Sequence, residues 1–238
     1  MNEILDELAR VAQERDARAS DARLASRVLE IKHFQQARFR HTYADLLAST
    51  RFGPATHFFL DQLYGPQDFT ERDHQFERVV PALVRLFPGE IVATVKALTR
   101  LHALSEELDG AMALALPRST EAGALDAIDY VRAWQAVGRR TDREAQISLV
   151  REIGFALDRY TRMPMLFASL RMMRGPARVA GLSSLQHFLE SGFDTFKSMH
   201  GAQVFLDLIG ERESAMVAAL FDPAPLAPGR HPALVQLP

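Results

Sequence analysis

Residues 90–116, EIVATVKALTRLHALSEELDGAMALAL, indicate the fold more clearly than any other stretch of the chain. Large apolar residues recur in it at steps of three and four, at Ile91, Val95, Leu98, Leu101, Leu104, Leu108 and Met112. Side chains with this spacing lie on one face of an α-helix, because the helix turns once every 3.6 residues. The stretch therefore predicts a long helix that is buried along one side.

The same spacing continues outward on both sides of this helix. From Ile4 to Ser49 the chain has no Gly or Pro, which predicts one very long helix or two helices that meet near Ser20. Ser20 and Asp21 then offer capping side chains for the second helix. Further helices are predicted downstream over residues 125–138, 141–160, 163–173, 181–191, 193–208 and 211–221.

Signals for β-strands are nearly missing from the sequence, which has no long alternating run and no Asn-Gly or Asp-Gly hairpin. We expect an all-α fold, a single bundle-like domain of about eight to ten helices. Within it, residues 1–50 form an N-terminal long helix or helix pair and residues 51–222 a helical core domain. Residues 223–238 hold five of the twelve prolines and are predicted to be a flexible tail.

Composition excludes several classes of protein. The chain has 238 residues, 47% of them hydrophobic and 24% charged, as expected for a globular protein. It has no cysteine, so disulfides, thiolate metal sites and cysteine nucleophiles are excluded. The net charge of −2 gives no reason to expect nucleic acid as a partner. No apolar run is long enough to span a membrane, no export signal is recognisable, and we expect a cytoplasmic protein.

Two longer segments and one short motif resemble a known family. They are residues 58–69 (FFLDQLYGPQDF), residues 192–206 (GFDTFKSMHGAQVFL) and residues 104–109 (LSEELD). All three are similar to a family of uncharacterised bacterial all-helical proteins, and the similarity extends from about Tyr43 to Phe221. The resemblance implies a bacterial, all-helical, cytosolic protein and carries over no activity and no catalytic residue.

A basic segment offers the first candidate site. Residues 159–189 contain no Asp or Glu and five arginines, Arg159, Arg162, Arg171, Arg174 and Arg178. Methionine, leucine and phenylalanine residues lie between them. Such a segment can bind an acidic protein partner, an anionic small ligand or, less in keeping with the rest of the chain, an anionic membrane surface. It can equally be a core helix whose arginines reach solvent and pair with acids elsewhere.

Aromatic residues follow the basic segment. Phe193 and Phe196 recur at a step of three and could supply apolar area to the same ligand or partner site, or simply form core. We assign both to the partner site with the five arginines.

Histidines and glutamates at several positions in the sequence support an alternative hypothesis, a metal- or haem-binding enzyme. Di-iron proteins use Glu-x-x-His pairs inside a helical bundle, and Glu71 and His74 match that spacing once. The other candidate ligands for iron or haem are His102, Glu106, His187 and Glu190. This alternative requires at least two of these pairs to converge in space.

The leading hypothesis is a non-enzymatic protein that binds a partner or ligand and needs no cofactor. A third hypothesis is a homodimer formed through the N-terminal helix, whose stripe of Ile4, Leu8 and Val11 would need a cover.

Overall fold

The computed structural model describes residues 2–63, 66–67, 69–117 and 125–238, and the regular structure in these residues is all helical, with no strand. The predicted all-α class is confirmed. Eight helices have more than ten residues: α1 (Asn2–Ser20), α2 (Ala22–Thr42), α5 (Thr70–Leu86), α6 (Gly89–Ala115), α7 (Ala127–Val137), α8 (Arg140–Thr161), α11 (Ser183–Ser198) and α12 (Gln203–Leu220). Shorter helices are α3 (Ala44–Leu47), α4 (Gly53–Phe58), α9 (Pro164–Met172) and α10 (Arg174–Val179), with a π-helical turn at Phe59–Leu63 and a 3-10 turn at Pro232–Val235.

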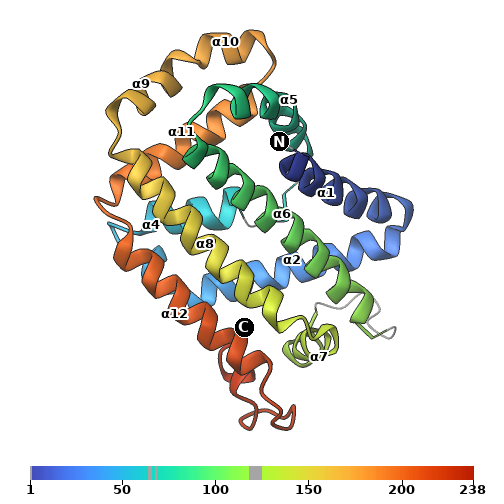
Figure 1. Cartoon of the computed structure of the whole chain (residues 1–238). Helices are drawn as coiled ribbons and strands as arrows, with labels where there is room; N and C mark the ends of the chain where they lie inside the picture. Colours follow the sequence, from blue (N-terminus) through green and yellow to red (C-terminus); the bar gives the residue numbers. More distant parts are fainter. Residues whose placement is uncertain (1, 64–65, 68, 118–124) are drawn as a thin grey trace.

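The helix predicted most clearly, α6, lies at the centre of the molecule (Figure 1). It packs against α1, α2, α7 and α8. Its buried side includes Leu104, Leu108 and Met112, as the spacing of three and four requires. The sequence also predicts a helix-ending turn at residues 64–66 and a loop at residues 117–123, and both fall largely outside the described residues.

Two helices, not one, form the N-terminal region. The carboxylate of Asp21 accepts hydrogen bonds from the backbone N–H groups of Arg23 and Leu24, at 2.9 and 3.1 Å, and so caps α2. The apolar stripe of α1, including Ile4 and Leu8, packs on side chains of α5 and α6. The stripe that suggested a homodimer is therefore covered within the same chain.

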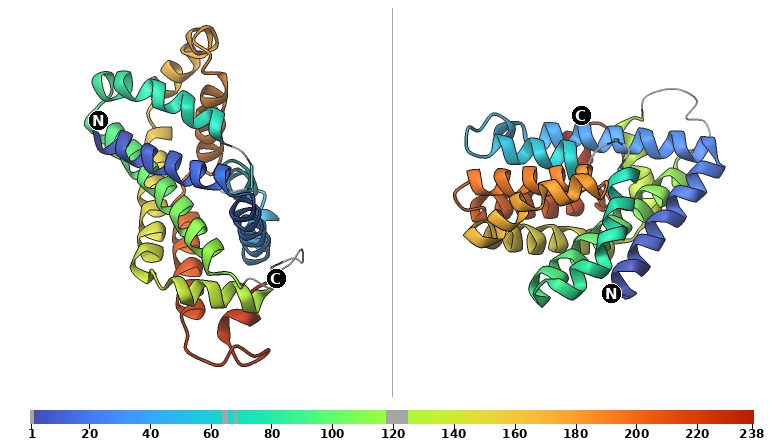
Figure 2. Two further views of the ribbon diagram at one scale, coloured as in Figure 1. Left: turned by 90° about the vertical axis from the view of Figure 1, so that its right-hand side faces the viewer. Right: turned by 90° about the horizontal axis from the view of Figure 1, so that it is seen from above.

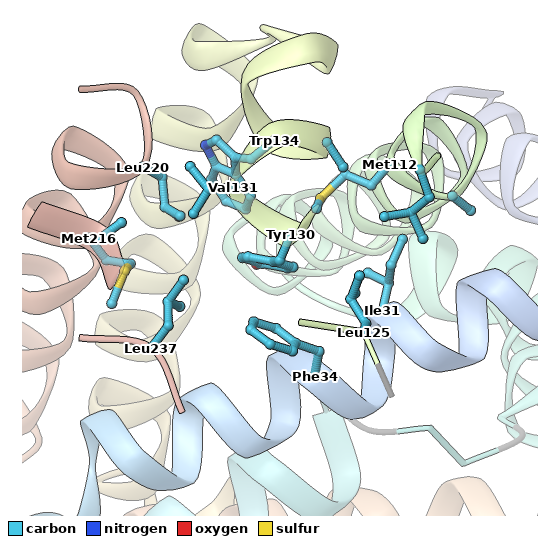
Figure 3. Packing of buried hydrophobic residues seen from close by; sticks show 14 of the residues in the cluster. Ile31, Phe34, Met112, Leu125, Tyr130, Val131, Trp134, Met216, Leu220 and Leu237 are labelled. Carbon is cyan, nitrogen blue, oxygen red and sulfur yellow. The ribbon is translucent and has the colours of Figure 1, made fainter. Parts of the chain in front are cut away.

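The largest core cluster surrounds Tyr130 of α7 (Figure 3). Tyr130 is fully buried and stacks on Phe34 of α2, with 4.4 Å between ring centroids. Met216 and Leu220 of α12 close another side of the cluster, and Leu237 of the C-terminal segment packs there too.

The C-terminal segment is packed, where the sequence suggested a flexible tail. His231 and Ala233 are fully buried, and the 3-10 turn contacts α7 and α12. Proline richness misled the prediction, because the few apolar residues between the prolines are enough to fix the segment on the core.

The C-terminal helices are divided differently from the prediction, at His200 and Gly201. Both residues have positive φ angles, 53° and 112°, which end α11 and redirect the chain into α12. The predicted ends near Gly192 and Gly210 are wrong, because α11 and α12 run through them. A Cβ atom at Gly192 would lie 3.0 Å from the Phe58 ring, so this glycine serves close packing.

At one end of the molecule, α9 and α10 lie beyond α11 (Figures 1 and 2). They contact each other, α11 and the end of α8. Among the described residues of these two helices only Ala177 is buried, so the pair is a single layer laid over the bundle. This layer contains most of the predicted basic segment.

Candidate functional site

The inner side of the α9–α10 layer holds it on α11. The ring of Phe167 stacks on Phe193 with 4.7 Å between centroids. The side-chain amide of Gln186 donates to the carbonyl of Leu170 at 2.7 Å. These contacts fix one face of the layer and leave the opposite face to solvent.

The outer face is rich in exposed apolar side chains. Five of the thirteen exposed large apolar residues in the described part of the chain fall within residues 163–179: Met163, Met165, Met172, Met173 and Val179. Met165 and Met172 are 83% and 79% exposed and lie seven residues apart, on the same side of α9. We call these five residues, with Arg171 and Arg178, the α9–α10 surface. Exposed apolar side chains concentrated in one short segment are typical of a site of interaction, whereas single scattered ones are not.

Three of the five predicted arginines have partners within the chain. Arg159 lies 3.5 Å from Glu90 and Arg162 lies 2.5 Å from Asp158. Arg174 of α10 binds Glu190 of α11 through its Nε and Nη2 atoms. These three guanidinium groups therefore bring little net charge to the surface.

The remaining two, Arg171 and Arg178, are exposed, and no described carboxylate lies within 4.0 Å of either. Arg171 covers one side of the Phe167 ring, 5.1 Å from its centroid. The ammonium group of Lys197 lies 4.8 Å from the same ring. The α9–α10 surface is thus apolar, with positive charge at its margin.

The two predicted aromatic residues lie in different places. Phe193 is half-buried and packs against Phe167 of α9. Phe196 is 1% exposed and belongs to a core cluster with Phe205 and Met199. Neither forms part of the outer face.

The residues of the alternative metal site are not brought together. Among the described residues no three His, Asp or Glu side chains are grouped so that they could hold a metal ion. Glu71 accepts from Gln75 and Ser184, and His74 is exposed beside Glu77. His187 is also exposed.

His102 belongs to a buried ion-pair layer between α1, α5 and α6. Its Nε2 atom lies 2.9 Å from Oδ2 of Asp73, and Arg15 donates to the same oxygen at 2.5 Å. Burial opposes the charge of Asp73, but the hydrogen bond to His102 and the charge of Arg15 lower the pKa of Asp73. This arrangement attaches α1 to the bundle.

Glu106 occupies a second position in this layer. It is paired with Arg18 of α1 at 2.5 Å and with Lys32 of α2 at 2.6 Å. Burial favours the neutral acid, yet the charges of Lys32 and Arg18 hold the pKa of Glu106 at about 2. Each carboxylate oxygen of Glu106 thus faces a basic side chain of its own chain.

Asp109, three residues further along α6, was not singled out from the sequence. It is 2% exposed and accepts one hydrogen bond, from Gln35 at 3.3 Å. Burial raises the pKa of Asp109 to about 6. Its place between Leu108 and the apolar run of residues 110–116 is the sign of a buried acid that the sequence offers.

Comparison with known proteins assigns the chain to a family. Residues 14–227 match the family described as Domain of unknown function (DUF8198), and the chain belongs to it. No curated protein and no solved structure matches the chain. In the described part of the chain, no helix combines the length and apolar character needed to cross a bilayer.

Proposed function

We propose that this protein is a non-enzymatic binding protein whose α9–α10 surface docks an acidic, apolar helix of a partner protein. One observation carries the proposal. Exposed methionines of α9 and of its two capping positions share residues 163–178 with Arg171 and Arg178, the two arginines of the basic segment without a described carboxylate partner.

The apolar part of the surface supplies the free energy of docking. Burying a methionine side chain is worth about 1.5–3 kcal/mol, before the entropy cost of association is subtracted. Met165 and Met172 lie about 10 Å apart along the axis of α9, at 1.5 Å per residue. A partner helix with apolar side chains at positions i, i+3, i+4 and i+7 matches this length.

The charged part of the surface selects the partner. Arg171 and Arg178 favour glutamate or aspartate at the edges of the partner's apolar face and speed its association at low salt. A lysine-rich helix of the same shape would be repelled.

A protein helix fits this surface better than a lipid bilayer does. Helices that lie on membranes combine several free basic residues with tryptophan, phenylalanine or leucine. Here three arginines are already paired, and four of the five apolar residues are methionines. Methionine side chains are flexible and polarizable, which suits a surface that adapts to another protein. The bacterial, cytoplasmic setting is part of the proposal and rests on the sequence resemblance.

The test uses the full chain and a defined probe. The probe is a fluorescein-labelled synthetic helix with leucines at i, i+3, i+4 and i+7 and glutamates on both sides of them. Fluorescence anisotropy measures its affinity for the wild-type chain and for the double variant R171E/R178E. We expect the variant to bind at least about tenfold more weakly, a loss of about 1.4 kcal/mol.

A matched control reverses two arginines elsewhere. Arg100 on α6 and Arg230 in the C-terminal segment are exposed, and the variant R100E/R230E changes the net charge by the same amount. It should bind the probe as the wild type does. Equal losses in both double variants, or no binding of the probe to the wild type, would overturn the proposal. Binding to phosphatidylglycerol vesicles but not to the peptide would overturn it in favour of a lipid surface.

A further inference from the structure

The methionines of this chain divide into two groups with opposite exposure. Met112, Met199 and Met216 are at most 2% exposed, each within the helical core. The four exposed methionines, at 47–83%, all lie on the α9–α10 surface: Met163, Met165, Met172 and Met173. Met1, the eighth methionine of the sequence, is outside the described residues.

This division has a chemical consequence. The chain has no cysteine, so thioethers are its only sulfur. A peroxide oxidises a thioether when the sulfur attacks one peroxide oxygen: an S–O bond forms, the O–O bond breaks, and water leaves. The sulfur is oxidised, hydrogen peroxide is reduced, and methionine becomes methionine sulfoxide. Exposed thioethers react this way, whereas the packed core protects the buried ones.

We propose that the four exposed methionines are a modification site, and that their oxidation by a peroxide switches off docking at the α9–α10 surface. This inference rests on the proposed function, since it concerns the same surface. It adds a regulation that the binding proposal does not contain.

Oxidation opposes docking in two ways. A sulfoxide is strongly polar, so burying it against the apolar side of a partner helix costs free energy where the thioether gained it. The sulfoxide oxygen also accepts hydrogen bonds, and Arg171 lies next to Met172 in the sequence. A guanidinium that donates to a sulfoxide is less available to a carboxylate of the partner. Both effects lower affinity without unfolding the bundle.

The first experiment tests the chemistry and does not depend on a partner. The full chain is treated with hydrogen peroxide, digested and mapped by mass spectrometry, where each added oxygen increases the mass by about 16 Da. We expect Met163, Met165, Met172 and Met173 to be oxidised well before the three core methionines, with an unchanged helical circular dichroism spectrum. Oxidation of the core methionines at equal rates would overturn the inference.

The second experiment tests the regulation with the acidic amphipathic peptide used above. Oxidised wild-type chain should bind it about tenfold more weakly than untreated chain, and methionine sulfoxide reductases of both stereospecificities should restore binding. A variant with leucine at the four positions (M163L/M165L/M172L/M173L) keeps an apolar surface that peroxide cannot modify. It should bind the peptide equally before and after treatment.

The outcomes separate this inference from the proposed function. If the untreated wild type binds the peptide and oxidised wild type binds it equally well, the regulation is wrong and the docking surface stands. If neither the untreated wild type nor the leucine variant binds the peptide, the proposed function fails, and the regulation fails with it. A loss of affinity in the leucine variant after peroxide would place the effect elsewhere in the chain and overturn the inference.

Discussion

Arg174 on α10 and Glu190 on α11 form a two-pronged ion pair, with Nε 2.6 Å and Nη2 2.5 Å from the carboxylate oxygens. Hydrogen bonding lowers the pKa of Glu190 and raises that of Arg174. From the sequence these two residues belonged to different predicted sites, Arg174 to a partner surface and Glu190 to a metal centre. Their pairing gives both a structural role and leaves Arg171 and Arg178 as the two arginines of the basic segment with no described carboxylate within 4.0 Å.

The first prediction concerns the attachment of the α9–α10 layer. Replacing Arg174 with alanine removes a link between α10 and α11 and leaves the rest of the bundle intact. We expect faster amide hydrogen exchange within residues 164–179 and a nearly unchanged melting temperature. Hydrogen exchange measured by mass spectrometry resolves the two effects.

Arg162 provides the control for this experiment. It pairs with Asp158 one turn earlier, on the helix that it follows, so R162A should not loosen α10. Equal acceleration of exchange in R174A and R162A would argue against a specific role for the pair with Glu190.

The second prediction concerns the buried acid Asp109. Its folded-state pKa of about 6 lies above the ordinary value of 3.8, so the charged form costs stability as pH rises from about 4 to 6. The variant D109N cannot ionise. It should exceed the wild type in free energy of unfolding by about 1–3 kcal/mol at neutral pH, and by much less near pH 4. Urea unfolding at the two pH values measures this, and a less stable D109N at neutral pH would contradict the assignment.

The third prediction concerns Glu106, whose pKa is lowered in the folded protein where that of Asp109 is raised. Its folded-state pKa of about 2 lies below the ordinary 4.5, so its ion pairs stabilise the fold above about pH 4.5 and are lost as pH falls toward 2. The variant E106Q leaves the half-buried Arg18 and Lys32 without their acid. We expect a loss of about 3 kcal/mol at neutral pH, because each pKa unit by which the ion pairs favour the charged form of Glu106 is worth about 1.4 kcal/mol.

The difference between E106Q and the wild type should shrink as pH falls below about 4, which urea unfolding at neutral and acidic pH can follow. A suitable control is E144Q, because Glu144 pairs with Arg140 on the exposed side of α8. Such a surface pair contributes about 0–1 kcal/mol. If E106Q were no less stable than E144Q, the buried layer would not be what holds α1 and α2 on α6.

Much of the fold could be predicted because it depends on local spacing. The central helix was expected over residues 90–116 and is found over Gly89–Ala115, since its apolar positions repeat with the helical period. A cap at Ser20 or Asp21 was likewise predicted, and in the structure Asp21 provides it. The break at His200 and Gly201 was placed wrongly, at Gly192 and Gly210. A glycine in the sequence can end a helix or allow close packing inside one, and only its neighbours in space decide which.

Pairings between distant segments could not be predicted. Glu190 lies one residue beyond the acid-free segment of residues 159–189, so a count along the chain missed the partner of Arg174. Arg15 and Asp73 meet across 58 positions, and nothing local to either residue indicates the contact. The exposure of the methionines could not be predicted either. Apolar residues at helical spacing indicate a buried face, and only the structure shows that these side chains are exposed.

Mapping where an acidic helix binds shows whether the α9–α10 surface is its docking site. Hydrogen exchange of the full chain would be measured with and without the glutamate- and leucine-containing peptide. We expect slower exchange in residues 163–182, and no such change in R171E/R178E at the same peptide concentration. Protection confined to other helices, or protection of the same residues in the double variant, would contradict the docking proposal.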